Sequence, residues 1–118
     1  MIRALLATVA LIVSVPAHAD AFRDREIAYQ ALNAIDAAQT CYIVGGGRGV
    51  EGNPLITIPL GNRPNCAALV GMKAGFGALH WFIADRINRS DPEAAKAFQI
   101  VSIVVQGSVV GLNMRLVF

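Results

Sequence analysis

The chain has 118 residues, of which 55% are hydrophobic and only 15% are charged. A soluble domain usually has about a quarter of its residues charged, so this protein is short of the surface charge that keeps proteins in solution. Its formal net charge of +2 is small and its basic residues are scattered along the chain, which argues against a nucleic-acid partner. The length allows one domain with a modest core.

The N-terminal residues have the pattern of a signal peptide. Arg3 supplies a positive charge, residues 4–15 are uncharged and apolar, and Pro16 precedes an Ala-His-Ala site of the kind that signal peptidase cuts. We therefore expect a signal peptide over residues 1–19 and a single domain over residues 20–118. The alternative is an uncleaved anchor, but this apolar segment is shorter than the ~20 residues that span a bilayer.

Three apolar stretches predict three helices, at about residues 24–44, 66–88 and 91–115. A loop rich in Gly, Pro and Asn separates the first two helices over residues 45–64. The expected fold is therefore all-α, with three helices in one domain that follows a cleavable signal peptide.

Particular residues indicate where these helices begin and end. A run of glycines that starts at Gly45 ends the first helix. Asn65 is placed to cap the second helix. Ser90 is placed to cap the third, with Pro92 in the first turn, where no backbone donor is needed.

Each predicted helix carries one narrow polar stripe on an otherwise apolar surface, with polar residues at helical spacings of three, four or seven. The stripes comprise Gln30, Asn33, Asp36 and Thr40; Lys73, Gly77 and His80; and Gln99, Ser102, Gln106 and Asn113. A soluble helix shows the opposite arrangement, an apolar stripe on a polar cylinder. Residues 66–83 contain one charge and residues 97–114 contain none, which suits membrane spans. The pattern predicts a small helical membrane bundle.

Polar stripes inside a bilayer are costly unless they face other helices, so the three stripes are expected to point toward one another. We predict an ion pair between Asp36 and Lys73, the acid and the base near the middle of the predicted spans. Four-apart glycines let membrane helices approach closely. The predicted second and third helices each have one such pair, Gly71 with Gly75 and Gly107 with Gly111, and we expect both at helix contacts.

Cys41 and Cys66 flank the predicted loop, and their state depends on the side of the membrane that this loop faces. They can form a disulfide on an oxidising side, whereas on the cytoplasmic side they would be free thiols. A cleaved leader followed by three spans would place residues 45–64 in the cytoplasm. The sequence leaves both alternatives open.

The sequence indicates no catalytic, cofactor-binding or metal-binding site. His80 is the only histidine after the leader, and one histidine with two separated cysteines gives no zinc or haem spacing. Residues 47–52 match the GxGxxG pattern, but a proline follows where a helix should begin. We therefore expect no enzyme, and take the intramembrane polar residues as the candidate site: Asp36, Lys73, His80, Gln106 and Asn113.

Two short motifs resemble those of a group of small, uncharacterised membrane proteins from bacteria and phages. The first helix carries an LxxxDxxQT-like motif that includes Asp36, and the loop carries E-x-N-P at Glu51, Asn53 and Pro54. The similarity extends over most of residues 28–115. It implies a small helical membrane protein, with no catalytic activity to carry over.

Together these features predict a non-enzymatic integral protein of the bacterial inner membrane, exported through its signal peptide. It would act through helix–helix contacts, as a homo-oligomer or with a small membrane-protein partner. One alternative is a channel-like or phage lysis-type protein, in which the polar stripes line a water path. The other is a soluble helical binding module of the periplasm.

Overall fold

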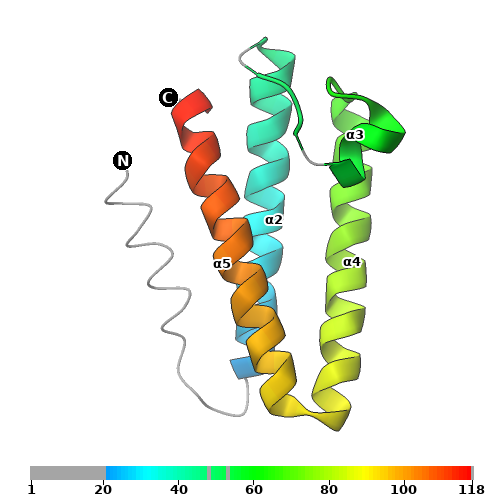
Figure 1. Ribbon diagram of the computed structural model, residues 1–118, viewed down its shortest axis with the longest axis vertical. Helices are drawn as coiled ribbons and strands as arrows, with labels where there is room; N and C mark the ends of the chain where they lie inside the picture. The colour runs from blue at the N-terminus through cyan, green and yellow to red at the C-terminus, as the bar shows by residue number, and fades with distance from the viewer. Residues whose placement is uncertain (1–20, 48, 53, 118) are drawn as a thin grey trace.

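The computed structural model describes residues 21–47, 49–52 and 54–117, so the predicted signal peptide and Asn53 lie outside the described residues. The described chain is all-α, as expected, and contains no strand. Its helices are α2 (Ala21–Gly45), α3 (Pro54–Leu60), α4 (Cys66–Ser90) and α5 (Pro92–Val117). The three long helices run side by side, and α3 lies at one end, next to the start of α4 (Figure 1).

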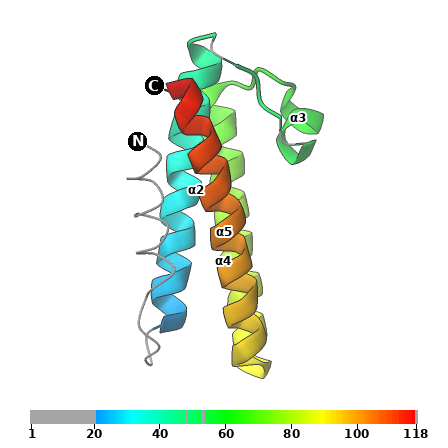
Figure 2. The same ribbon diagram turned by 60° about the vertical axis from the view of Figure 1, so that its left-hand side comes forward.

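Helix α3 corrects the expectation of three helices joined by an irregular loop. Pro54 occupies its first position, where a missing N–H costs nothing. Ile56 is fully buried and anchors the segment. Gly61 has a φ of 79°, which favours glycine, and its N–H bonds to the carbonyl of Thr57 at 2.8 Å. Helix α3 packs against α4 and extends to the side of the bundle (Figure 2).

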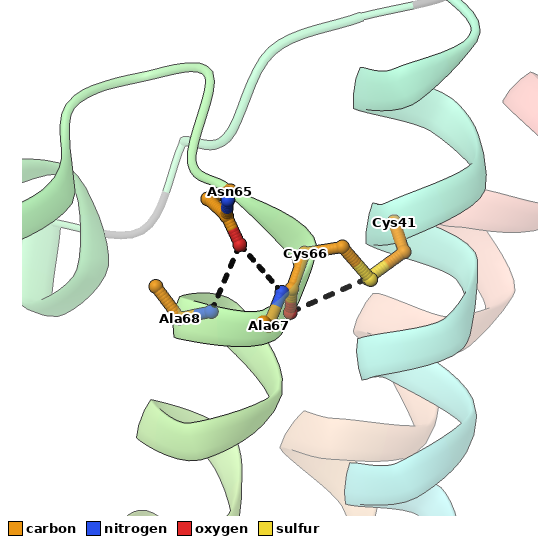
Figure 3. The surroundings of a disulfide bond; sticks show 5 residues. All are labelled: Cys41, Asn65, Cys66, Ala67 and Ala68. Carbon is orange, nitrogen blue, oxygen red and sulfur yellow. Dashed lines mark hydrogen bonds between the residues drawn. A yellow bond between two sulfur atoms is a disulfide. The ribbon is translucent and has the colours of Figure 1, made fainter.

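The helix ends agree with the sequence at two of three positions. Helix α2 ends at Gly45, and Gly47 follows with a φ of 69°. The Asn65 side chain caps α4 by accepting bonds from the backbone N–H groups of residues 67 and 68 at 2.8 and 3.3 Å (Figure 3). Ser90, however, is the last residue of α4 rather than the cap of α5. Asp91, directly before the proline, accepts the backbone N–H of residue 94 at 3.0 Å instead.

Helix α2 is the central element, because it packs extensively against α5 and also contacts α4. The buried apolar cluster between α2 and α5 is small: it consists of Leu32, Ile103 and Val110. Polar side chains make up much of the rest of the buried interior, and they are described below.

A disulfide joins Cys41 near the end of α2 to Cys66 at the start of α4, with 5.3 Å between the Cα atoms (Figure 3). Of the two cysteine states that the sequence left open, the structure therefore contains the oxidised one. The bond links the end of α2 covalently to the start of α4, which the loop and α3 also connect along the chain.

The glycines that bring α2 and α4 together differ from those expected. Gly71 and Gly75 are exposed, and a Cβ atom built on either meets nothing within 4 Å. A Cβ atom on Gly77 would lie 2.5 Å from Gln30 Oε1 and 3.3 Å from Asn33 Nδ2. The reason is the helical period: Gly77 lies four residues after the inward-facing Lys73, whereas Gly71 and Gly75 lie on another face. Gly107 is buried in α5, as expected.

By length and composition, α4 and α5 are apolar enough to cross a membrane, and most of the residues in both lie on the outside of the bundle. Helix α2 does not pass the same test, because charged and polar residues occur along much of its length. Two candidate spans therefore replace the three that we expected.

We predict opposite effects for leucine at two neighbouring glycines of α4. Gly77→Leu should lower the free energy of unfolding by about 1–3 kcal/mol, because the new side chain pushes α4 away from α2. Gly75→Leu, which points into open space in the single chain, should leave the stability of the monomer unchanged or raise it by up to ~1 kcal/mol through helix propensity. Denaturant unfolding in detergent micelles measures both. Equal effects at the two positions would contradict the α2–α4 contact.

Candidate functional site

The interior of the bundle is lined by polar side chains from all three long helices. Most come from α2, and α4 contributes a base and a histidine. The buried polar and charged residues are Glu26, Asn33, Asp36, Gln39, Thr40, Lys73, His80 and Gln99. The predicted inward orientation of the polar stripes is thus present in the structure.

The predicted ion pair between Asp36 and Lys73 lies in the half of the bundle that contains the disulfide. Lys73 Nζ bonds to Asp36 Oδ2, and both side chains are more than nine-tenths buried. Asn113 Nδ2 from α5 donates to the other carboxylate oxygen at 2.7 Å. A carboxylate on α2 therefore contacts both neighbouring helices.

Amide side chains extend this cluster along α2. Asn33 Nδ2 donates to the Lys73 carbonyl at 2.8 Å. Gln39 Nε2 donates to the Val110 carbonyl at 3.2 Å, and Gln39 Oε1 accepts from Asn113 at 3.3 Å. These bonds join α2 to the backbones of both α4 and α5, so they fix the register between the helices.

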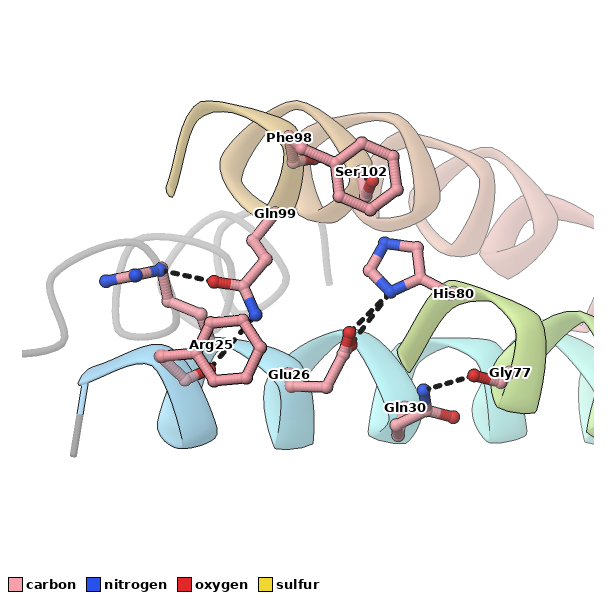
Figure 4. A network of polar contacts seen from close by, with 9 residues as sticks. Arg25, Glu26, Gln30, Gly77, His80, Phe98, Gln99 and Ser102 are labelled. Carbon is pink, nitrogen blue, oxygen red and sulfur yellow. Dashed lines mark hydrogen bonds and ion pairs between the residues drawn. The ribbon is translucent and has the colours of Figure 1, made fainter. Parts of the chain in front are cut away.

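A second cluster surrounds His80, toward the other end of the bundle. His80 Nδ1 lies 2.5 and 2.8 Å from the two carboxylate oxygens of the fully buried Glu26 (Figure 4). The imidazole is stacked between Tyr29 and Phe98, with ring centroids 3.6 and 4.7 Å away. The nearby Gln99 accepts from Arg25 Nε at 2.8 Å.

Two cavities lie beside these clusters. One, of about 410 Å³, lies between the Asp36–Lys73 pair and the loop after α2, and Glu51 and Pro54 line it. The other, of about 270 Å³, opens to the outside of the bundle, and His80, Tyr29 and Phe98 line it together with apolar side chains such as Leu79 and Ile83. Lys73 and Gln106 line both cavities.

The structure brings the predicted site residues together to different degrees. Asp36, Lys73 and Asn113 form one bonded group, whereas His80 belongs to the cluster around Glu26. Gln106 lies between them without bonding to either group, and its Nε2 has no partner among the described residues.

Of the predicted loop motif, two residues can be placed. Glu51 lines the larger cavity, and its backbone N–H bonds to the Asn62 carbonyl at 2.8 Å. Pro54 starts α3, and Asn53 lies outside the described residues. The motif therefore forms part of the cavity wall at the disulfide end of the bundle.

Glu26 is the principal residue that the sequence reasoning missed, and it corrects the statement that Asp36 is the acid of the spans. It lies four residues before Gln30, so extending the polar stripe by one turn would have found it. Gln39 was noted only as part of a motif, although it follows Asp36 by three residues. No group of three His, Cys, Asp or Glu residues in the described part of the chain is placed to hold a metal ion.

No protein-family model, curated protein or solved structure matches this chain.

We predict that Lys73→Met lowers the free energy of unfolding by about 3–5 kcal/mol, because Asp36 is then left charged and buried without its partner. Replacing both residues, with Asp36→Leu and Lys73→Met, should cost much less than the single change. Denaturant unfolding of the four proteins of this double-mutant cycle measures the coupling.

The exposed ion pair between Asp85 and Arg89, one turn apart on α4, is the matched control. Removing it with Arg89→Met should cost less than about 1 kcal/mol, since water screens exposed pairs. A Lys73→Met effect as small as that of Arg89→Met would contradict the structural role of the buried pair.

Proposed function

We propose that this protein is a small, non-enzymatic integral membrane protein of the bacterial envelope that acts through helix–helix contacts. The observation that supports this proposal is its inverted polarity. Charged and amide side chains fill the interior, while the exposed side chains of α4 and α5 include many large apolar ones. These are Val70, Leu79, Trp81, Phe82, Ile83, Val101, Val104, Val105, Val109, Leu112 and Leu116. Such a surface is unfavourable in water and suited to acyl chains.

The exposed face of α4 supports contacts with a further helix. Gly71 and Gly75 lie on it four residues apart, with open space above both. Glycines at this spacing let the backbones of two membrane helices approach closely. A second copy of this chain or a small membrane protein is therefore the partner that we propose. The resemblance to small bacterial and phage membrane proteins favours the same function class.

Trp81, the single tryptophan of the chain, provides a direct test because it is 43% exposed on α4. In vesicles made with lipids brominated along their acyl chains, we expect strong quenching of its fluorescence, since it would face those chains. Aqueous iodide should quench it little. The double variant Trp81→Phe/Ser90→Trp moves the tryptophan to the α4–α5 turn. Its fluorescence should then be quenched strongly by iodide and little by the brominated lipids. Efficient iodide quenching of Trp81 itself would favour the soluble periplasmic alternative.

We further propose that the disulfide end of the bundle faces the exported, oxidising side of the membrane. The opposite end carries more basic residues, and Lys and Arg favour the cytoplasmic side. They are Arg23 and Arg25 at the start of α2, Arg86 and Arg89 at the end of α4, and Lys96 in α5. This orientation is opposite to the one expected from a cleaved leader and three spans.

Orientation and leader cleavage are linked, because α2 begins at the end of the bundle that contains the α4–α5 turn (Figure 1). If α2 crosses the membrane with its disulfide end outside, residue 21 lies inside, where the leader would not be cut. We therefore predict that mass spectrometry of the purified protein, alkylated without reductant, finds residues 1–19 present and both thiols protected.

The other results of that measurement contradict this orientation in different ways. A chain that starts at residue 20 with two alkylated thiols would show the reverse orientation. A chain that starts at residue 20 with an intact disulfide would place both ends of α2 in the periplasm, and would favour the soluble module.

A further inference from the structure

The two ring nitrogens of His80 have different surroundings. Nδ1 faces the Glu26 carboxylate at 2.5 and 2.8 Å. Nε2 is buried and has no hydrogen-bond partner among the described residues, although the side chain is more than nine-tenths buried and lines the 270 Å³ cavity. With Nδ1–H donating to Glu26, the neutral ring leaves a lone pair on Nε2 as a proton acceptor within the bundle.

The two cavities adjoin at Lys73 and Gln106, which line both. Gln106 Nε2 is the other buried side-chain nitrogen without a partner in the described part of the chain. Each cavity is several times larger than the ≈ 30 Å³ that one water occupies in the liquid. Polar side chains line part of each, including His80 in the smaller cavity and Asp36 in the larger one, and these give water its hydrogen-bond partners.

Taken together, the clusters and cavities extend along most of α2. Glu26 belongs to the His80 cluster and Val44 lines the larger cavity. The helical segment between these two residues is ~27 Å long at 1.5 Å per residue. The hydrocarbon core of a bilayer is ~30 Å thick. A polar interior of this length can therefore connect the two sides of a membrane, apart from short stretches at the ends.

We propose that this interior is a proton path, in which Glu26 and His80 form the relay and the two cavities hold the connecting water. A hydronium ion in the smaller cavity gives its proton to His80 Nε2 and becomes water. The imidazolium then gives its Nδ1 proton to a Glu26 carboxylate oxygen, which leaves a neutral ring and a neutral acid. Local opening at the end of the bundle where α2 begins lets the fully buried Glu26 pass this proton to water. The ring returns to its first tautomer when Nε2 gives its proton to cavity water and Nδ1 takes one up, which completes the cycle.

The groups around His80 favour this exchange. From α2, the Glu26 carboxylate faces Nδ1 within hydrogen-bond distance, and Tyr29 stacks on the ring. From α5, the uncharged Phe98 covers the other face. Lys73, across the cavity on the same helix as His80, is paired with Asp36, so its charge is largely neutralised. A proton is the cation expected here, since Asp36 and Glu26 are each already bound to a base.

The proton path requires the proposed membrane function, and the experiment tests proton conduction and membrane insertion separately. The full chain is reconstituted into vesicles that contain the pH-sensitive dye pyranine, and a valinomycin-driven potassium gradient pulls protons across. We expect proton flux well above that of empty vesicles, without release of entrapped carboxyfluorescein. His80→Gln should reduce the flux at least tenfold, and Trp81→Phe, on the outer face of α4, should leave it unchanged.

Gln106→Leu distinguishes a path from a purely structural interior, even if His80→Gln fails to fold. Removing an unpaired buried amide should preserve or raise the thermal stability, yet it should reduce the flux at least tenfold by placing an apolar side chain between the cavities. Unchanged flux in this variant would overturn the proposal.

Two outcomes with the wild-type protein would also overturn it. Protein that floats with the vesicles but conducts no better than empty vesicles would refute the path and leave the membrane function standing, whereas protein that does not float would refute both. Release of carboxyfluorescein together with protons would show a non-selective pore, as expected of a lysis-type protein.

Discussion

The Asp36 carboxylate is the constraint on which the arrangement of the helices depends. One of its oxygens binds Lys73 of α4, and the other accepts a bond from Asn113 of α5 at 2.7 Å. Turning α2 by one residue, about 100°, would move this charge out of the interior and onto the apolar exterior. Because an unpaired charge there costs several kcal/mol, a single residue of α2 determines how both neighbouring helices face it.

This constraint gives the three long helices unequal roles. Helices α4 and α5 are each apolar enough to cross a membrane alone, and together they form a hairpin with a short turn. Helix α2 is not apolar enough to cross a membrane alone, because many of its buried side chains are polar and bond to partners on α4 and α5. In the proposed bilayer setting its stability would therefore depend on the hairpin, and the disulfide between Cys41 and Cys66 links its end to α4.

The features that were predictable from the sequence are those set by local periodicity. Spacings of three and four residues gave the inward faces of all three helices and the pair of Asp36 with Lys73. The same rule would have included Glu26, which was missed only because the stripe was begun one turn too late. The same rule placed Gly77 on the inward stripe of α4, whereas the expectation for Gly71 and Gly75 used their spacing alone and ignored the face on which they lie. The cysteine pairing could not be derived, because it depends on the redox conditions to which the loop is exposed, and a separation along the chain does not determine these.

The hydrogen bonding of the interior polar groups distinguishes residues that hold the helices together from residues that would carry protons. Asn33 and Gln39 donate to carbonyl groups on neighbouring helices, as residues that hold a bundle together should. His80 and Gln106 each keep one buried nitrogen without a partner among the described residues, at a cost of about 1–3 kcal/mol for each. Apolar side chains at both positions would avoid this cost if stability were the only requirement. His80 lines the smaller cavity and Gln106 lines both, so the two nitrogens without partners lie where water would enter. This placement favours a proton path over a purely structural interior.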